Sequence, residues 1–362
     1  MNMRYCYMSY RSIARLNLSN VENIIGHWSK YIPYIKPYYA VKSFQNDDLL
    51  KFLSKNNFGF DCASMNEIKL VKDYNAPIIF ANPTKSIDDI NYAINNNVDM
   101  IVVDSIEEII KIMNINRNVK FIIRILGDET FSSIRFNNKF GATYEEFINM
   151  LNFINDNNLI LSGFSYHNGS KCHNMKSHYN SVRNIIENYI EPCYSFNLKP
   201  TLIDIGGGFE NVRQLQDINE VLEPLKNTIS NINVKLIAEP GRLISSVSLD
   251  IYTKIIALRE RNVDGIKTLY ITINDSVYHS FQGKIYDGQN YEPIPLYDNN
   301  ELIRCIIFGQ TCDSLDMITE NVILPYPKLN DILLFKNMGA YTIASAYGEF
   351  NGFKPAIVLH PW

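Results

Sequence analysis

The residues that could do chemistry in this sequence stand where short apolar runs end. The run "PYYAV" is followed by Lys42, and a lysine there is costly to bury unless it is paired or chemically altered. The runs that follow end in, or carry, Asp61, Asn82-Pro83, Asp104, Arg124, His167, Gly206-Gly207-Gly208 and Glu239-Pro240-Gly241-Arg242. Eight such ends in succession predict that these residues meet at one functional face.

The glycines of "DIGGGF", Gly206, Gly207 and Gly208, suit a close approach of the backbone to another group. The simplest interpretation is a tight turn from strand to helix. The alternative is a phosphate cradle, in which backbone N–H groups face an anion that a Cβ would otherwise obstruct. The segment "EPGR" favours the cradle, because Arg242 can add a bidentate contact to the same phosphate.

A lysine, a phosphate cradle and an acid at one face match the needs of pyridoxal 5'-phosphate. This cofactor takes a Schiff-base lysine and an acidic partner for its ring nitrogen, and Lys42 and Glu239 supply one of each. A Schiff base would also remove the cost of a buried Lys42 ammonium. His167 is either a core histidine or a ring stacked on the cofactor. The segment "YHNGS" favours stacking, with Ser170 as a further phosphate donor.

The elements that must position these residues alternate along the first two thirds of the chain. Eight apolar runs alternate with segments such as "SIEEIIKIMNIN" and "TYEEFINMLNFINDNN", whose apolar residues recur every three to four positions after a Ser or Thr cap. This alternation predicts parallel βαβ units and favours an α/β fold with a (β/α)8 TIM-type barrel over residues 17–248. A doubly wound open sheet is the structural alternative, because periodicity does not show closure.

The last third of the chain has a different pattern. Runs such as "TLYITIND", "ELIRCIIFG" and "DILLFKN" are rich in β-forming residues, and turn signals at Asp264-Gly265 and Asp287-Gly288 separate them. They predict a second, mainly antiparallel β domain over residues 249–362, which residues 1–16 are expected to join.

Composition narrows the class of protein. The chain has 362 residues, a net charge of −4 and 46% hydrophobic residues, which is typical of a globular protein and provides no basic field for nucleic acid. No apolar run reaches the about 18–20 residues of a membrane span, and no signal-peptide core is present, so we expect a cytoplasmic protein without membrane contact. The cysteines form no CxxC pair, which predicts free thiols and no metal site: Cys6, Cys62, Cys172, Cys193, Cys305 and Cys312.

The motifs together resemble the eukaryotic-type ornithine decarboxylases, pyridoxal-phosphate enzymes with an alanine-racemase-like barrel (fold type III). They are "YYAVKSF", "GFDCASMNEI", "FANPTK", "HNGS", "DIGGGF", "AEPGR", "YITINDSVYHSFQGKIYD", "TCDSLDMI", "GAYTIASA" and "FNGF", in the family's order from residue 37 to 353. The resemblance implies a cofactor-bearing barrel, a C-terminal β domain and a homodimer in which the partner chain completes each active site.

The resemblance also implies roles for individual residues. Lys42 matches the lysine that carries the cofactor, and Asp61 and Glu67 match the acids beside it. The positions that match cofactor contacts are Lys42, Asp61, Arg124, His167, Ser170, Gly206, Gly207, Gly208, Glu239, Gly241, Arg242 and Tyr341. Those that match catalytic residues are Lys42, His167, Glu239 and Cys312, and those that match substrate contacts are Tyr286, Asp287, Asp313 and Phe350.

The implied reaction is decarboxylation of a dibasic amino acid. L-ornithine to putrescine, a step of polyamine biosynthesis, is the leading expectation. A carboxylate at the ring nitrogen keeps the cofactor an effective electron sink. A positioned thiol such as Cys312 can return a proton to Cα. Asp287 and Asp313 of the partner chain are expected to bind the distal ammonium of the substrate.

The sequence departs from the family's pattern at several positions. Asn168 stands in "HNGSKC" where an apolar residue is usual, Lys171 where Gly is usual, and Gln310 where Pro is common. One extra residue lies between Tyr341 and "FNGF", near the assigned Phe350. The family's longer N-terminal segment and its degradation-linked C-terminal tail are also expected to be missing.

Other functions stay open at this point. Lysine or arginine decarboxylation is the nearest alternative, since Asp287 favours a shorter amine only weakly. A non-catalytic regulatory homologue is a lesser alternative, because the cofactor-site residues all remain. A racemase or a diaminopimelate decarboxylase is disfavoured, since Glu239 stands where racemases have Arg and Cys312-Asp313 where the latter enzymes have Glu-Ser. Whether an antizyme-like protein binds is not readable from these residues.

Overall fold

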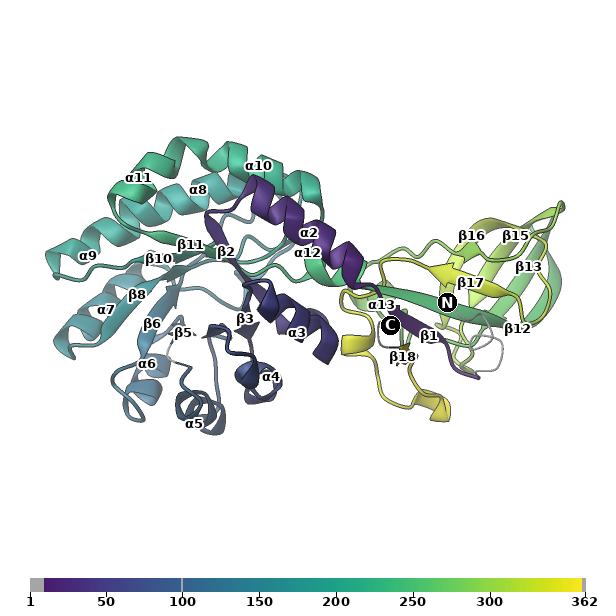
Figure 1. Cartoon of the computed structure of the whole chain (residues 1–362), viewed down its shortest axis with the longest axis horizontal. Helices are drawn as coiled ribbons and strands as arrows, with labels where there is room; N and C mark the ends of the chain where they lie inside the picture. Colours follow the sequence, from purple (N-terminus) through teal and green to yellow (C-terminus); the bar gives the residue numbers. More distant parts are fainter. Residues whose placement is uncertain (1–9, 99, 360–362) are drawn as a thin grey trace. The chain divides into compact units, whose positions relative to one another are not determined.

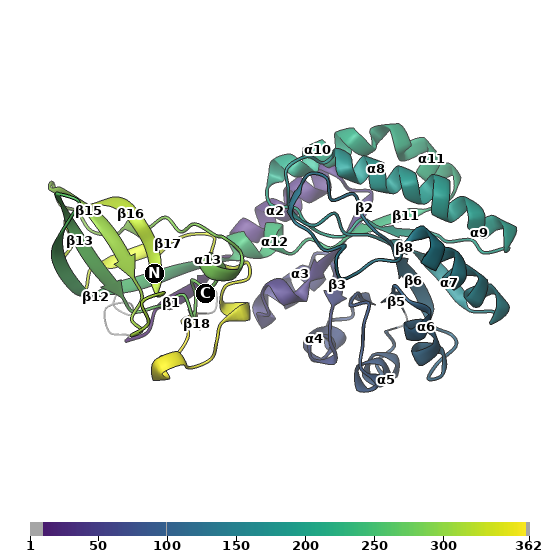
Figure 2. The same cartoon turned by 180° about the vertical axis from the view of Figure 1, so that it is seen from behind.

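The computed structural model describes residues 10–98 and 100–359 of the chain. These divide into two compact units, of which one is Glu22–Ile244 and the other combines the segment before it with the chain from Ser245 onwards. Figure 1 and Figure 2 show the units from opposite sides. Cys6 and the extreme ends of the predicted β domain lie outside the described residues.

Among the described residues, eight parallel strands close into a barrel in the first unit (Figure 1). Their order around the ring is β10-β11-β2-β3-β4-β5-β6-β8, and the pairing of β10 with β8 completes it. The predicted (β/α)8 barrel is therefore confirmed, and the open sheet is wrong. The strands are β2 (Ile35–Ala40), β3 (Gly59–Cys62), β4 (Ile78–Phe80), β5 (Met100–Val103), β6 (Lys120–Arg124), β8 (Ile160–Ser165), β10 (Leu202–Asp204) and β11 (Lys235–Ala238).

Helices alternate with these strands, and several of them begin at capping residues. Ser86 and Ser105 each accept the N–H of the third helical residue, as the sequence predicts, and Thr143 forms a capping box with Glu146. The helices are α2 (Leu18–Tyr31), α3 (Asp47–Lys55), α4 (Met65–Val71), α5 (Ile87–Asn95), α6 (Ile106–Met113), α7 (Tyr144–Asp156), α8 (Lys176–Asn184), α9 (Glu191–Ser195), α10 (Val212–Leu222), α11 (Lys226–Asn231) and α12 (Arg242–Ser245).

The barrel strands contribute a packed apolar cluster. Its members are Tyr38, Ile79, Val102, Ile122, Leu202 and Ile237, which come from six different strands. Burial of each such side chain contributes about 1.5–3 kcal/mol relative to its exposure to water. The strands are therefore held rigidly, and the residues that follow them are presented on a fixed ring.

The second unit is a mainly antiparallel sheet, as the sequence predicts. Its strands follow the order β14-β17-β12-β13-β15-β16, with β1 paired to β12 and β18 paired to β1. Asp264 (φ 54°) and Gly265 (φ 78°) form the predicted turn between β12 and β13. The elements are β1 (Ile13–Leu16), β12 (Leu249–Val263), β13 (Ile266–Ile273), α13 (Gly283–Tyr286), β14 (Ile294–Pro295), β15 (Leu302–Phe308), β16 (Met317–Pro325), β17 (Ile332–Phe335) and β18 (Ile357–Leu359).

Two further observations concern the chain as described. Across residues 10–98 and 100–359, none of the helices has the length and apolar character that a membrane crossing requires. Four cysteines of this range are buried, and Cys312 is exposed, so the predicted free thiols are confirmed for Cys62, Cys172, Cys193, Cys305 and Cys312.

Candidate active site

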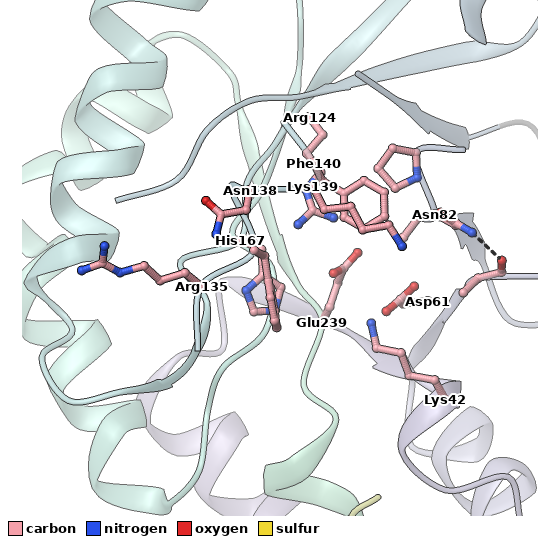
Figure 3. A pocket seen from close by; sticks show the side chains of 14 residues that line it. Lys42, Asp61, Asn82, Arg124, Arg135, Asn138, Lys139, Phe140, His167 and Glu239 are labelled. Carbon is pink, nitrogen blue, oxygen red and sulfur yellow. Dashed lines mark hydrogen bonds between the residues drawn. The ribbon is translucent and has the colours of Figure 1, made fainter. Parts of the chain in front are cut away.

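A cavity of about 450 Å³ lies in the barrel unit where the strands end (Figure 3). It brings together residues from six of the eight predicted strand ends: Lys42, Asp61, Asn82 with Pro83, Arg124, His167 and Glu239. They belong to, or follow within three residues, the strands β2, β3, β4, β6, β8 and β11. Because the carboxyl ends of parallel strands meet at one rim of a barrel, residues far apart in the sequence share one cavity.

Lys42 lies in a 3₁₀ turn, Val41–Ser43, directly after β2. The expectation that its amine is buried is wrong, since the residue is exposed. The strand ends at Ala40, so Lys42 stands beyond it and extends into the open cavity toward Asp61 (Figure 3). An accessible primary amine beside acids can form a Schiff base with an aldehyde.

Asp61 and Glu239 lie near this amine, and Asp204 lies near both acids. Asp61 and Asp204 are buried and Glu239 is half-buried. Desolvation, followed by the charge of Asp204, raises the pKa of Glu239 well above its usual range. Desolvation and Glu239 likewise raise the pKa of Asp61, and burial raises the pKa of Asp204 to about 7. A cationic ring nitrogen placed among these acids would favour their ionised forms.

His167 lies in the cavity with a neutral ring. The backbone N–H of Gly169 donates to Nδ1 of His167 at 3.0 Å, so Nδ1 is an acceptor and carries no proton. Desolvation, followed by the charges of Arg124 and Lys42, lowers the pKa of His167 well below its usual range. The edge of Phe136 meets the ring with centroids 4.8 Å apart. A flat, uncharged ring of this kind suits stacking on an aromatic cofactor.

The predicted glycine cradle passes beside His167. A Cβ on Gly207 would lie 2.7 Å from the carbonyl O of Glu239 and 3.3 Å from Nε2 of His167. Gly206 and Gly208 have φ angles of 67° and 95°, which favour glycine. These positions therefore need glycine for the backbone to pass so close to Glu239 and His167, and their role as a phosphate cradle stays a prediction.

Neither the predicted glycine cradle nor the predicted cofactor contacts Ser170, Gly241 and Arg242 line the cavity. Ser170 begins β9 (Ser170–Cys172), which pairs with β7 (Ser132–Ile134). Arg242 forms an ion pair with Oε1 of Glu210 at 3.8 Å, and Gly241 precedes it at the start of α12. Their role as phosphate contacts stays a prediction.

The structure adds a cavity wall that the strand-end pattern missed. It is the loop between β6 and α7, which contributes Arg135, Phe136, Asn138, Lys139 and Phe140. The guanidinium of Arg124 stacks over the Phe140 ring at 5.0 Å. The signal was present in the sequence as the basic and aromatic segment "RFNNKF" in a long connection after a barrel strand.

The β unit holds a second group of predicted residues around two stacked rings. Tyr278 and Phe350 stack at 4.0 Å between centroids, and the Tyr278 hydroxyl donates to Oδ2 of Asp313. The backbone N–H and thiol of Cys312 contact Oδ1 of Asn351 at 3.1 and 3.3 Å. The structure therefore brings Cys312, Asp313 and Phe350 together, and Tyr278 is a member that sequence reasoning missed.

The remaining predicted residues of the β unit lie around α13. Tyr286 ends this helix with 78% of its surface exposed, and Asp287 follows it. Gln289 donates to Oδ2 of Asp287 and to the backbone O of Ala340. The next residue, Tyr341, has a φ angle of 54° and accepts from Ser345 at its backbone O.

Comparison with known proteins decides the family. The model of the pyridoxal-dependent decarboxylase, pyridoxal binding domain, matches residues 18–246, and that of the C-terminal sheet domain matches residues 246–339. The chain belongs to the pyridoxal-dependent decarboxylases. This decarboxylase thus acts on an amino acid and uses pyridoxal phosphate, and the resemblance seen in its motifs is confirmed.

The relatives of this decarboxylase have several functions. Antizyme inhibitor 2 of Xenopus laevis is 34% identical over 91% of this chain and 76% of its own length. Ornithine decarboxylase of Rattus norvegicus is 33% identical over 90% and 75%. The crystal structure of the Paramecium bursaria Chlorella virus arginine decarboxylase superposes with a TM-score of 0.91 at 30% identity, covering 99% of this chain and 98% of that one.

The residues of the cavity fit pyridoxal phosphate. The decarboxylase offers an exposed amine, acids of raised pKa, a neutral imidazole and a glycine turn that no Cβ could occupy. Within the described residues, Oδ2 of Asp204 is buried without a hydrogen-bond partner. A protonated ring nitrogen close to the acids would lessen the cost of that burial.

Proposed function

We propose that this decarboxylase converts L-ornithine to putrescine, as in polyamine biosynthesis. The observation that carries the proposal is a pair of carboxylates in the β unit, Asp287 and Asp313, each held by a neighbouring side chain. The substrate's distal ammonium requires such acceptors, because charge-assisted hydrogen bonds to carboxylates are strong. The 33% identity to the ornithine decarboxylase of Rattus norvegicus supports the same substrate.

The barrel residues would hold the cofactor and control charge. Lys42 is the amine that would hold it, and Glu239 is the acid that would keep its ring nitrogen protonated. His167 would offer the face of its neutral ring. When bound, pyridoxal phosphate supplies an electron sink for the bond that breaks as the substrate's carboxylate leaves.

The thiol of Cys312 is the proposed proton donor to Cα of the product. Its Sγ is exposed and lies 3.3 Å from Oδ1 of Asn351, so the side chain is held at the surface of the β unit. We propose that this group serves the barrel of a second chain, which makes the enzyme a homodimer with shared sites. The exposed thiol of Cys312, the half-buried carboxylate of Asp313 and the half-buried stacked ring pair form a surface that a partner chain would cover.

Lysine or arginine is the second candidate substrate. The structural similarity to the viral arginine decarboxylase favours it, since that similarity covers 99% of this chain. The difference between the substrates is the distance from Cα to the distal cation. The position of Asp287 would therefore decide between them.

The deciding experiment is CO2 release by the purified enzyme from ornithine, lysine, arginine and diaminopimelate, each with pyridoxal phosphate. We expect the highest kcat/KM for ornithine. A higher value for lysine or arginine would replace the proposed substrate while keeping the reaction. A protein that binds no cofactor and releases no CO2 from any of them would instead indicate a regulatory homologue.

A further inference from the structure

The side chain of Asn168 anchors the cavity-lining loop between β6 and α7. Asn168 directly follows His167 and is fully buried. A buried amide at this position calls for a physical reason, because burying a polar side chain is costly unless it is hydrogen-bonded. The contacts of Asn168 connect the segment that carries the cavity residue His167 to this loop.

Asn168 is connected to the base of this loop by two direct contacts and by one bridging serine of α8. Ser181 of α8 donates to Oδ1 of Asn168 at 2.9 Å, and the Ser181 hydroxyl accepts from the backbone N–H of Asp128 at 3.1 Å. The hydroxyl of Ser132 donates to the backbone O of Asn168. A Cβ on Gly127 would lie only 2.6 Å from Oδ1, so the loop backbone packs directly on the amide.

The other end of the Asn168 amide is unsatisfied. Within the described residues, its Nδ2 is buried and has no hydrogen-bond partner. An unpaired buried donor destabilises a protein, and an apolar side chain would avoid that cost. Stability of the core alone therefore does not account for an asparagine here, whereas attachment of the loop does.

The attached loop forms one wall of the active-site cavity. The loop is also held by the β7–β9 pairing, by the contacts of Asn137 with the backbone of Gly127, and by Asn180 and His173, which bond to its first half. Beyond them, Arg135, Phe136 and Lys139 reach the cavity. We propose that Asn168 is a positioning residue that holds loop 127–140 against the cavity and thereby strengthens substrate binding. This goes beyond the proposed function and holds whichever dibasic amino acid the enzyme prefers.

The test pairs Asn168→Val with Ser181→Ala in the cofactor-loaded enzyme. The double variant removes both partners of the buried hydrogen bond together with the unpaired Nδ2, but it also leaves the N–H of Asp128 without its Ser181 acceptor, so its Tm should stay close to that of the wild type. Limited digestion with trypsin should nevertheless cut faster after Arg135 and Lys139, both of which are exposed. The expected increase in cleavage rate is roughly threefold to tenfold, which corresponds to the free energy of one buried hydrogen bond. KM for the preferred amino acid should rise by a similar factor at nearly constant kcat.

The control is Asn188→Ala, which removes an exposed amide contact with Asn184 and should change neither cleavage nor KM. Unchanged cleavage after Arg135 and Lys139 in the double variant would overturn the inference. A lower Tm with faster cleavage throughout the chain would do the same, because it would indicate a purely structural role. The digestion does not depend on the substrate, so a failure of the ornithine proposal remains distinguishable.

Discussion

The side-chain amide of Gln289 holds the carboxylate of Asp287 by a hydrogen bond of 2.6 Å to Oδ2. The same nitrogen, Nε2, also donates to the backbone O of Ala340 at 3.1 Å. Oε1 of Gln289 accepts a hydrogen bond from the hydroxyl of Tyr291. The amide is thus satisfied on both sides. Asp287, the proposed acceptor of the substrate's distal ammonium, is therefore fixed in place by a residue that would not touch the substrate.

Replacing Gln289 should change substrate preference. In Gln289→Ala, Asp287 loses its tether, and KM for ornithine should rise roughly threefold to tenfold, as expected for one hydrogen bond. KM for lysine and arginine should rise less, because a less constrained carboxylate can shift to meet a longer side chain. Steady-state CO2 release on the three amino acids measures this. The neighbouring Asn290→Ala is the control, and an equal loss on every substrate would contradict the prediction.

Complementation between inactive chains should reveal shared sites. Lys42→Ala removes the proposed cofactor-holding amine, and Cys312→Ala removes the proposed proton donor, so each variant alone should be nearly inactive in putrescine formation. Equal amounts mixed and allowed to exchange should recover about a quarter of wild-type activity, from one intact site in half of the dimers. A mixture that stays inactive while sedimentation shows exchanged dimers would rule out sites shared between chains.

The acids of the barrel should make the cofactor-free enzyme less stable as pH rises. Burial raises the pKa of Asp204 from 3.8 to about 7 in the folded protein. Between these values the folded state binds more protons than the unfolded state, so the free energy of unfolding falls as pH increases, by up to about 1.4 kcal/mol per pH unit. Urea unfolding at several pH values measures the slope. Asp204→Asn should flatten it, and an unchanged slope would refute the assignment.

The buried Lys85 should have the opposite effect at higher pH. Its ammonium donates to the backbone O of Val102 at 2.6 Å, near Glu108, and desolvation lowers its pKa from 10.5 to about 7. Between these values the unfolded chain holds the additional proton, so stability rises as pH increases from about 7 toward 10.5. Lys85→Met should remove this rise in urea unfolding experiments. The exposed Lys55→Met is the control and should retain it.

Much of the barrel site could be predicted because strand ends are visible in a sequence. Lys42, Asp61 and Glu239 each follow or end a run of β-forming residues, and parallel strands bring such positions to one rim. The exposure of Lys42 could not be predicted, because it depends on β2 stopping at Ala40 rather than one residue later. A boundary of that kind is decided by tertiary packing.

The residues of the cavity wall and the contacts within the β unit could not be predicted as readily from the sequence. Phe136 and Lys139 sit in an irregular connection, where no periodicity marks which side chains turn inward. Tyr278 and Phe350, which stack on each other, are distant in the chain, so no local sequence pattern predicts this contact. The sequence shows which side chains are present, whereas which of them contact one another depends on the tertiary structure.

The neighbouring positions of β2 and β11 in the barrel also bear on how the enzyme matures. The chain after β2 carries Lys42 and the chain after β11 carries Glu239, and the backbone N–H of Ala40 donates to the O of Pro240 at 3.3 Å. These two segments meet only when the first and last strands of the barrel pair, a contact of very long sequence separation that forms slowly. The absorbance of the lysine-bound cofactor should thus appear late in refolding, after most secondary structure has formed. Its rate of appearance would then report the final step of barrel assembly.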